Sequence, residues 1–133
     1  MEECFEFPSG IFGFPASKRW VLVPAERRSF FWLQSLDCPS LAFLLVDPFA
    51  VTQDFYVDLP EGDLLPLKAS HSSDIGVLAI VTLPRDPGDA PTANLQGLLA
   101  LNFTKRVGRQ VIIQESRYGT RWPVNLQKPD PNS

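Results

Sequence analysis

Few residues in this chain have side chains and spacings suited to catalysis. His71 is the only histidine, so a Ser-His-Asp relay would have to use it. The neighbouring Ser70, Ser72 and Ser73 do not form the strained turn that exposes a nucleophilic serine. We therefore interpret His71 as a loop residue or a cap before the apolar run that begins at Ile75.

The sequence also has few residues that could bind a metal ion or act as a catalytic acid and base. Cys4 and Cys38 are the only cysteines and stand far apart, so with one histidine they do not assemble a zinc site. Asp47, Asp54 and Asp58 might converge as a carboxylate pair, but nothing in the pattern sets the separation that glycoside hydrolysis requires. No glycine-rich stretch matches a phosphate-binding loop. We predict a protein that is not an enzyme and has no metal and no cofactor.

Composition limits the class of partner. The chain of 133 residues has a net charge of -3 and a pI near 5.0, which argues against a surface for nucleic acid and favours a basic protein partner. The N-terminus lacks the basic and apolar regions of a secretory signal, and no run approaches the ~18 apolar residues of a membrane helix. We expect no direct nucleic acid or membrane binding and a cytoplasmic location. One domain over residues 1–126 is expected, with a disordered polar tail over 127–133.

Short apolar runs recur along the chain and indicate an all-β protein. They are rich in β-branched and aromatic residues and are separated by Pro, Gly and Asp. The gaps are too short for helical crossovers, so we expect antiparallel neighbours. The thirteen prolines also favour strands and turns over helices. The predicted strands are Trp20–Val23, Phe30–Leu33, Leu41–Val46, Phe55–Leu59, Ile75–Leu83, Leu98–Phe103 and Val111–Ile113.

Two runs differ in their patterning. Leu99, Leu101 and Phe103 alternate, so they share one face of their strand. Leu41–Val46 is apolar on both faces, which is typical of a central strand covered on both sides or of a barrel wall touched by a helix.

One helix and one hairpin are predicted outside these runs. Acidic residues early in Pro60–Lys68 suit a helix N-terminus, but Gly62 and Pro66 limit the helix to a short one. Thr104–Gln110 lies between two strands and is predicted as a hairpin with a basic tip, in which Gly108 takes a positive φ.

Three aromatic residues fall on predicted loops instead of strands. Phe12 and Phe14 stand beside glycines, and Phe49 follows the Asp47-Pro48 break. An aromatic residue on a loop either folds back into the core or anchors a partner. The sequence leaves both interpretations open.

Several segments, taken in order, resemble the FliW family of flagellar assembly factors. Each motif is weak alone, but their order and spacing together are specific, and they cover roughly residues 5 to 126. The matching segments are Phe5–Pro15, Trp20–Pro24, Phe31–Ser35, Pro39–Phe49, Ile75–Pro84, Thr92–Asn102 and Gln110–Ile113.

The resemblance implies a fold and a function. It implies a small, partly open, antiparallel β-barrel-like domain with at most one or two short helices. It also implies a non-catalytic flagellar assembly factor that binds flagellin and the basic translational regulator CsrA. By switching partners, such a factor relieves CsrA repression of flagellin translation. Family members usually begin with about a dozen further residues that form a first strand, so the resemblance implies that this strand is absent here.

Candidate partner-facing residues follow from the same resemblance. They are Asp47, Phe49, Asp54, Tyr56, Asp58 and Asn94. An alternative of a different class stays open: a small barrel that binds a nucleotide or flavin in an apolar cavity, which the strand-and-aromatic pattern also allows.

Overall fold

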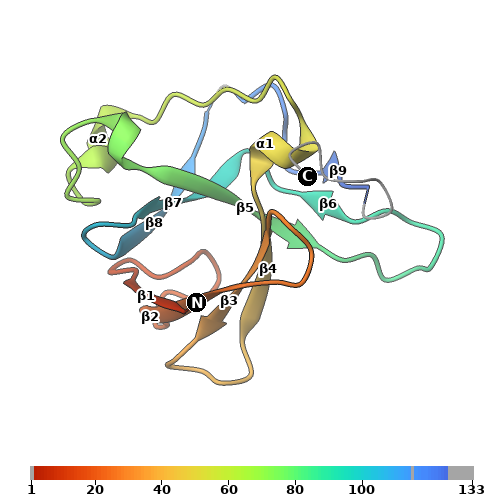
Figure 1. The fold of residues 1–133 in the computed structure, drawn as a ribbon, viewed down its shortest axis with the longest axis horizontal. Coiled ribbons are helices and arrows are strands. Elements are labelled where there is room, and N and C mark those ends of the chain that lie inside the picture. The colour runs from red at the N-terminus through yellow and green to blue at the C-terminus, as the bar shows by residue number, and fades with distance from the viewer. Residues whose placement is uncertain (1, 115, 126–133) are drawn as a thin grey trace.

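A computed structural model describes residues 2–114 and 116–125. Seven strands follow one another in the order β4-β3-β2-β1-β8-β7-β5, and pairing between β4 and β5 closes them into a barrel (Figure 1). Two short strands, β6 and β9, extend the sheet beyond β5. The bounds are β1 Glu3–Glu6, β2 Arg19–Pro24, β3 Phe30–Ser35, β4 Ala42–Val46, β5 Gly76–Thr82, β6 Thr92–Ala93, β7 Gly97–Asn102, β8 Val107–Ile112 and β9 Trp122–Pro123.

The all-β barrel with antiparallel neighbours is confirmed. Among the described strands, the one parallel pairing is β1 with β8, through Glu6 and Val107. The barrel is closed and not partly open as expected, because β4 pairs with β3 on one side and with β5 on the other. Two short α-helices, α1 (Pro48–Val51) and α2 (Glu61–Leu64), and the 3-10 helix η1 (Ser72–Asp74) lie between β4 and β5.

Side chains from β1, β2, β3, β4, β5 and β7 and from the loop after β1 point into the barrel and fill it. Cross-strand partners such as Leu22 with Leu33 and Leu78 with Leu99 belong to the same buried group. We call this group the inner cluster, and burying it removes a large apolar area from water. Its members are Phe5, Phe7, Ile11, Trp20, Leu22, Leu33, Leu45, Leu78, Leu99 and Leu101.

The outer wall of the barrel is also covered on one side. The other residues of β7, Leu98 and Ala100, are buried as well, so every residue of this strand is buried. They pack beneath the connection from β4 to β5, which crosses the top of the molecule in Figure 1. Asp63 of α2 bonds Arg109 of β8 at 2.7 Å and fixes that connection to the barrel.

Two sequence predictions between β4 and β5 need comment. The predicted helix at Pro60–Lys68 is confirmed as the short α2, and α1 had no counterpart among the predictions. The predicted strand at Phe55–Leu59 is wrong, because the segment has strand-like burial but pairs with no strand among the described residues.

The hairpin between β7 and β8 is present, but its conformation differs from the prediction. The positive φ of 59° belongs to Arg106, whereas Gly108 lies within β8. Glycine is needed at 108 for space, because a Cβ atom there would lie 2.3 Å from the Phe7 ring. At the hairpin, Arg106 pairs with Glu3 at 3.2 Å.

Two predictions about the ends of the chain remain predictions. The polar tail over 127–133 lies outside the described residues. Glu3–Glu6 forms β1, hydrogen-bonded to β2 on one side and to β8 on the other. The absence of the family's first strand stays an expectation from the resemblance.

Candidate functional site

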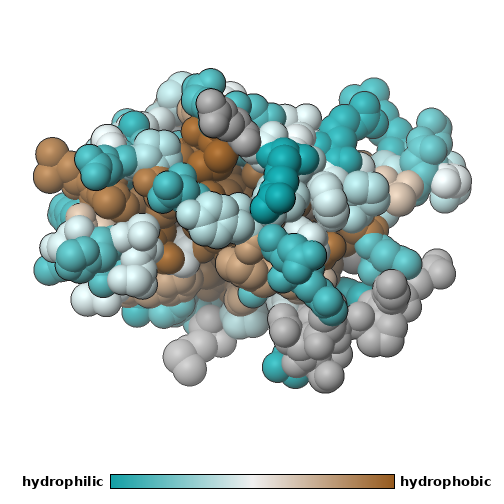
Figure 2. Space-filling view, turned by 90° about the horizontal axis from the view of Figure 1, so that it is seen from above, coloured by the Kyte–Doolittle hydropathy of each residue, from teal (hydrophilic) through white to brown (hydrophobic). Residues whose placement is uncertain are grey.

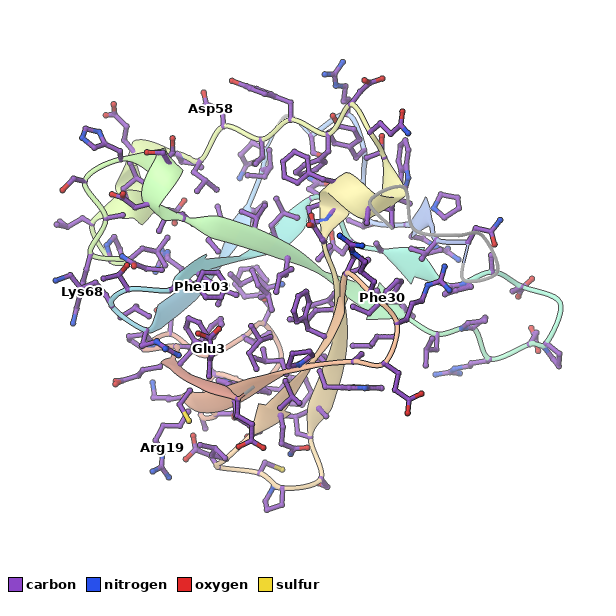
Figure 3. The ribbon with its side chains drawn as sticks, viewed as in Figure 1. Glu3, Arg19, Phe30, Asp58, Lys68 and Phe103 are labelled. Atoms are coloured by element: carbon purple, nitrogen blue, oxygen red, sulfur yellow. The ribbon has the colours of Figure 1, made fainter. Side chains whose placement is uncertain are left out.

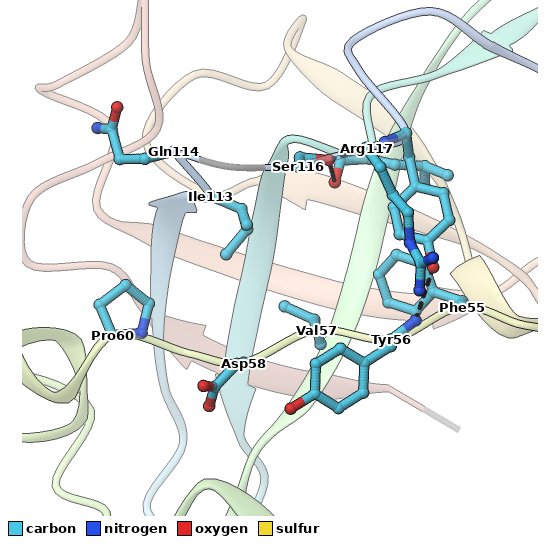
Figure 4. Close-up of a pocket in the computed structure, with 11 residues that line it drawn as sticks. Phe55, Tyr56, Val57, Asp58, Pro60, Ile113, Gln114, Ser116 and Arg117 are labelled. Atoms are coloured by element: carbon cyan, nitrogen blue, oxygen red, sulfur yellow. Dashed lines mark hydrogen bonds between the residues drawn. The ribbon is translucent and has the colours of Figure 1, made fainter.

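A surface depression lies beside the segment Phe55–Pro60. This groove has a volume of about 410 Å³. The segment forms one wall, and the chain that follows β8 forms the other, with Val57 and Ile113 between them (Figure 4). The remaining lining residues are Phe55, Tyr56, Asp58, Pro60, Leu95, Gln114, Ser116, Arg117 and Tyr118.

The side chains of Phe55–Leu59 alternate between inside and outside. Phe55 and Leu59 are buried and Val57 is half-buried, whereas Tyr56 and Asp58 are exposed. This period of two is the signature of an extended chain. In Figure 3, Asp58 points away from the barrel. Figure 2 looks down on this face and shows hydrophilic side chains interspersed with hydrophobic surface, which is found in the middle of the face and toward the α2 end.

A row of aromatic rings holds one end of the segment. Phe49 meets Phe55 edge to face at 5.2 Å, Phe55 contacts Tyr118 at 5.0 Å, and Tyr118 contacts Trp122 at 5.5 Å. Such contacts stabilise beyond simple burial of area. The row packs α1, the segment and the C-terminal part of the described chain against one another.

The Tyr118 hydroxyl makes two hydrogen bonds to the main chain of the segment. It accepts from the N–H of Tyr56 and donates to the C=O of Asp54, both at 3.0 Å. Tyr118 is itself placed by Ser116, whose hydroxyl accepts from the Tyr118 N–H at 3.2 Å. The hydroxyl thus occupies the position that a neighbouring strand would take at this end of the segment.

Five of the predicted site residues lie on or next to this segment. Asp47 caps α1, where its Oδ1 accepts from the Phe49 N–H at 3.0 Å. Phe49 has 47% of its surface exposed and Tyr56 has 68%, so both are available to a partner. Asp54 and Asp58 are also exposed.

Asn94, the sixth predicted site residue, has a local structural role. Its Oδ1 accepts from the N–H groups of Gln96 and Gly97, at 3.0 and 2.8 Å. The side chain therefore shapes the turn into β7. The next residue, Leu95, lines the groove.

The charged residues of the segment and its flanks are all acidic. Between Thr52 and Leu67 the sequence has four carboxylates and no lysine or arginine. Asp63 is paired with Arg109, whereas Asp54, Asp58 and Glu61 are exposed. On the opposite wall, Arg117 lies over the Tyr118 ring, 5.6 Å from its centroid. The segment therefore presents negative charge to solvent.

A second depression of about 330 Å³ lies beside the loop that carries Phe12 and Phe14. Phe14 lines it and contacts Phe43 edge to face at 5.7 Å, while Phe12 has 62% of its surface exposed. Phe14 is therefore partly folded back against the barrel, whereas Phe12 is exposed to solvent.

Asp37 holds the rim of this second depression. It accepts from the backbone N–H groups of Arg19 and Lys18, at 2.9 and 2.8 Å, and from the Arg19 guanidinium at 3.1 Å. The Arg19 N–H first, then the Lys18 N–H and the Arg19 side chain, lower the pKa of Asp37 to about 2.

The residues whose side chains could act in catalysis do not form a cluster among the described residues. His71 is exposed and precedes η1, with its N–H donating to Asp74 at 3.2 Å. Over residues 2–114 and 116–125, no group of three His, Cys, Asp or Glu side chains is placed to hold a metal ion. Within those ranges, no helix has the length and hydropathy to span a membrane.

Sequence reasoning missed Tyr118 and Ile113 as parts of the site. They stand some sixty positions after the segment that they contact, as the separation of 62 between Tyr56 and Tyr118 records. A tyrosine beside a glycine after the last long apolar run carries no signal of such a contact. Only the folded barrel brings the two stretches together.

Comparisons with known proteins agree on one family. The family model described as "FliW protein" matches residues 1–124. A flagellar assembly factor FliW from Treponema denticola is 35% identical over 92% of this chain and 83% of its own length. The one from Symbiobacterium thermophilum is 39% identical over 93% and 91%. The crystal structure of the flagellar assembly factor FliW superposes with a TM-score of 0.82 at 33% identity, covering 95% of this chain and 88% of that one.

Proposed function

Because this chain belongs to the FliW family, we propose that it binds flagellin and a CsrA-type translational regulator and exchanges one for the other. When flagellin is bound, CsrA is free to repress flagellin translation. When flagellin has been exported, this protein sequesters CsrA and relieves the repression. The protein acts by binding and not by catalysis, and it acts in the cytoplasm, where translation takes place.

We assign this binding to the half-buried Asp47 and to four exposed residues on and next to the extended segment: Phe49, Asp54, Tyr56 and Asp58. The observation that carries the assignment is the exposure of Tyr56 between two exposed carboxylates. Tyrosine is enriched among residues that dominate interface energies, and acidic neighbours speed encounter with a basic partner. Asn94 contributes indirectly, through the turn that places Leu95 in the groove.

The rigid support of this surface favours binding further. Tyr56 follows Phe55, which is buried and held in the aromatic row. A side chain on such a support loses little freedom on binding, so more of its contact energy appears as affinity.

The alternative of a nucleotide or flavin in the barrel has less support. The inner cluster fills the barrel, with Phe7, Trp20 and Leu33 at 0% exposure. Small-ligand sites are cavities of several hundred Å³, and the interior side chains described here occupy that space.

A titration tests the proposal. Purified protein is added to CsrA bound to flagellin leader RNA, with and without prior addition of flagellin. We expect release of the RNA, and we expect flagellin to prevent that release. Failure to form a complex with either partner would reject the proposed function.

Two matched variants test the assigned surface. Tyr56→Ala is expected to weaken the CsrA complex by roughly tenfold or more, the effect of losing ~1.4 kcal/mol of interface energy. Phe12→Ala removes a similarly exposed aromatic residue from the loop beside the second depression and serves as control. Equal weakening by the two, or weakening by Phe12→Ala alone, would move the site away from the segment.

A further inference from the structure

The main chain of the segment Tyr56–Leu59 has hydrogen-bonding groups that no other described residue uses. Among the described residues, no hydrogen bond is made by the C=O of Tyr56, by either main-chain group of Val57 and Asp58, or by those of Leu59. The segment is nevertheless extended and fixed, because its alternate side chains are buried. It is a strand in shape without a strand beside it.

The orientation of the main-chain groups that make no hydrogen bond follows from the orientation of the groups that bond to Tyr118. In an extended chain, main-chain groups two residues apart point to the same side. The C=O of Asp54 and the N–H of Tyr56 point toward the Tyr118 hydroxyl. The C=O of Tyr56 and the N–H of Asp58 therefore point to the same side, where the groove lies (Figure 4).

From this geometry we propose that the groove binds an extended peptide, which adds to Tyr56–Leu59 as a short strand. Tyr118 already fills the first position of that ladder, and the peptide takes the next. Pro60, which has no N–H, ends the ladder, so only a few peptide residues pair.

The groove also specifies the side chains of this peptide. Its inward residues would lie against Val57 and Ile113, which favours β-branched apolar side chains. Its outward residues would lie next to Asp58, and oppositely charged neighbours across a ladder attract. Asp54 and Glu61, which flank the segment in the sequence, add negative charge. The occupant is therefore a segment in which apolar and basic residues alternate.

This inference concerns the surface of the proposed function but does not require flagellin or CsrA. Its test uses synthetic peptides, so its failure and that of the proposed function can be told apart. The probe is a seven-residue peptide of alternating lysine and valine with fluorescein at its N-terminus, and binding is read by fluorescence anisotropy.

N-methylation separates pairing from simple charge attraction. One peptide is N-methylated on its valines and a second on its inner lysines. Since alternate N–H groups face opposite edges of a strand, we expect one of the two to bind roughly tenfold weaker and the other to bind like the parent. A peptide with glutamate in place of lysine is expected to bind more weakly than the parent.

The protein side is tested at Asp58. Asp58→Ala removes the carboxylate and keeps the N–H, whereas Asp58→Pro removes both. We expect Asp58→Pro to bind the parent peptide roughly tenfold more weakly than Asp58→Ala, with similar thermal unfolding for the two variants.

Four outcomes would overturn the inference. They are no binding of the parent peptide, equal binding of the two N-methylated peptides, equal binding by Asp58→Pro and Asp58→Ala, and slow exchange of the Asp58 amide hydrogen in a dimer of the free chain. The last outcome would mean that a second copy already occupies the edge.

Discussion

Strand β7 and the segment Phe55–Leu59 have similar sequence patterns but different structures. Both are short, apolar and flanked by turn-forming residues. β7 is hydrogen-bonded to β5 on one side and to β8 on the other, and all of its residues are buried. Phe55–Leu59 has buried side chains only at alternate positions and no ladder among the described strands.

This difference in pairing shows that a β-strand has two separate requirements, which a prediction from sequence does not distinguish. Burial of alternate side chains makes a chain extended. A neighbour with free main-chain groups makes it a strand. Phe55–Leu59 meets the first requirement, because it packs on the outside of a barrel whose strands already pair with one another. What is left is an extended edge at the surface, which is suited to binding.

The largest expected effect comes from a core substitution in β7. Leu99 is fully buried in the inner cluster, so Leu99→Ala leaves a cavity and should lower the free energy of unfolding by about 3 kcal/mol. Val57→Ala in the segment, where the side chain is half-buried, should lower it by about 1 kcal/mol. Urea denaturation measures both. Equal losses would mean that the segment contributes to stability as a barrel strand does.

A smaller effect is expected where the segment meets Tyr118. Tyr118→Phe keeps the ring between Phe55 and Trp122 but removes the hydroxyl, so stability should fall by about 1 kcal/mol and the Tyr56 amide hydrogen should exchange faster. Tyr56→Phe removes an exposed hydroxyl and should leave stability unchanged within about 0.5 kcal/mol. If Tyr118→Phe behaves like its control, the hydroxyl does not hold the segment.

The smallest effect is expected at the exposed turn after β3, where charge instead of burial holds the chain. The pKa of Asp37 falls from 3.8 to about 2 on folding. In acid the unfolded chain therefore takes up the proton first, so the stabilisation by Asp37 is complete above pH 3.8 and is lost as the pH falls toward 2. The stability difference between the protein and Asp37→Asn should shrink over this range in urea titrations. A difference that does not change with pH would contradict the cause given for the shift.

Much of the fold was predictable because local patterns carry it. The runs at Trp20–Val23, Phe30–Leu33 and Leu41–Val46 became β2, β3 and β4 because alternation and turn residues are local properties. The hairpin conformation was not predictable. Gly108 was expected at a positive φ, but the ring of Phe7, about a hundred positions earlier in the chain, accounts for the glycine.

For the candidate site too, one part could be predicted from the sequence and another part could not. The sequence pointed to Asp54, Tyr56 and Asp58. The structure places Tyr56 and Asp58 on an exposed edge of a groove, with Asp54 just before them in the chain. The sequence could not point to Tyr118 or Ile113 on the other side, because their contact with the segment depends on how the barrel closes.

By itself, the sequence determined the all-β class, the antiparallel neighbours, the acidic balance and, through ordered motifs, the family. These properties depend on residue type and short-range spacing. Tertiary structure alone decided that Phe55–Leu59 has no strand beside it within residues 2–114 and 116–125, because pairing depends on which edges remain free once the other strands have closed the barrel. The same closure decided which exposed side chains share one surface.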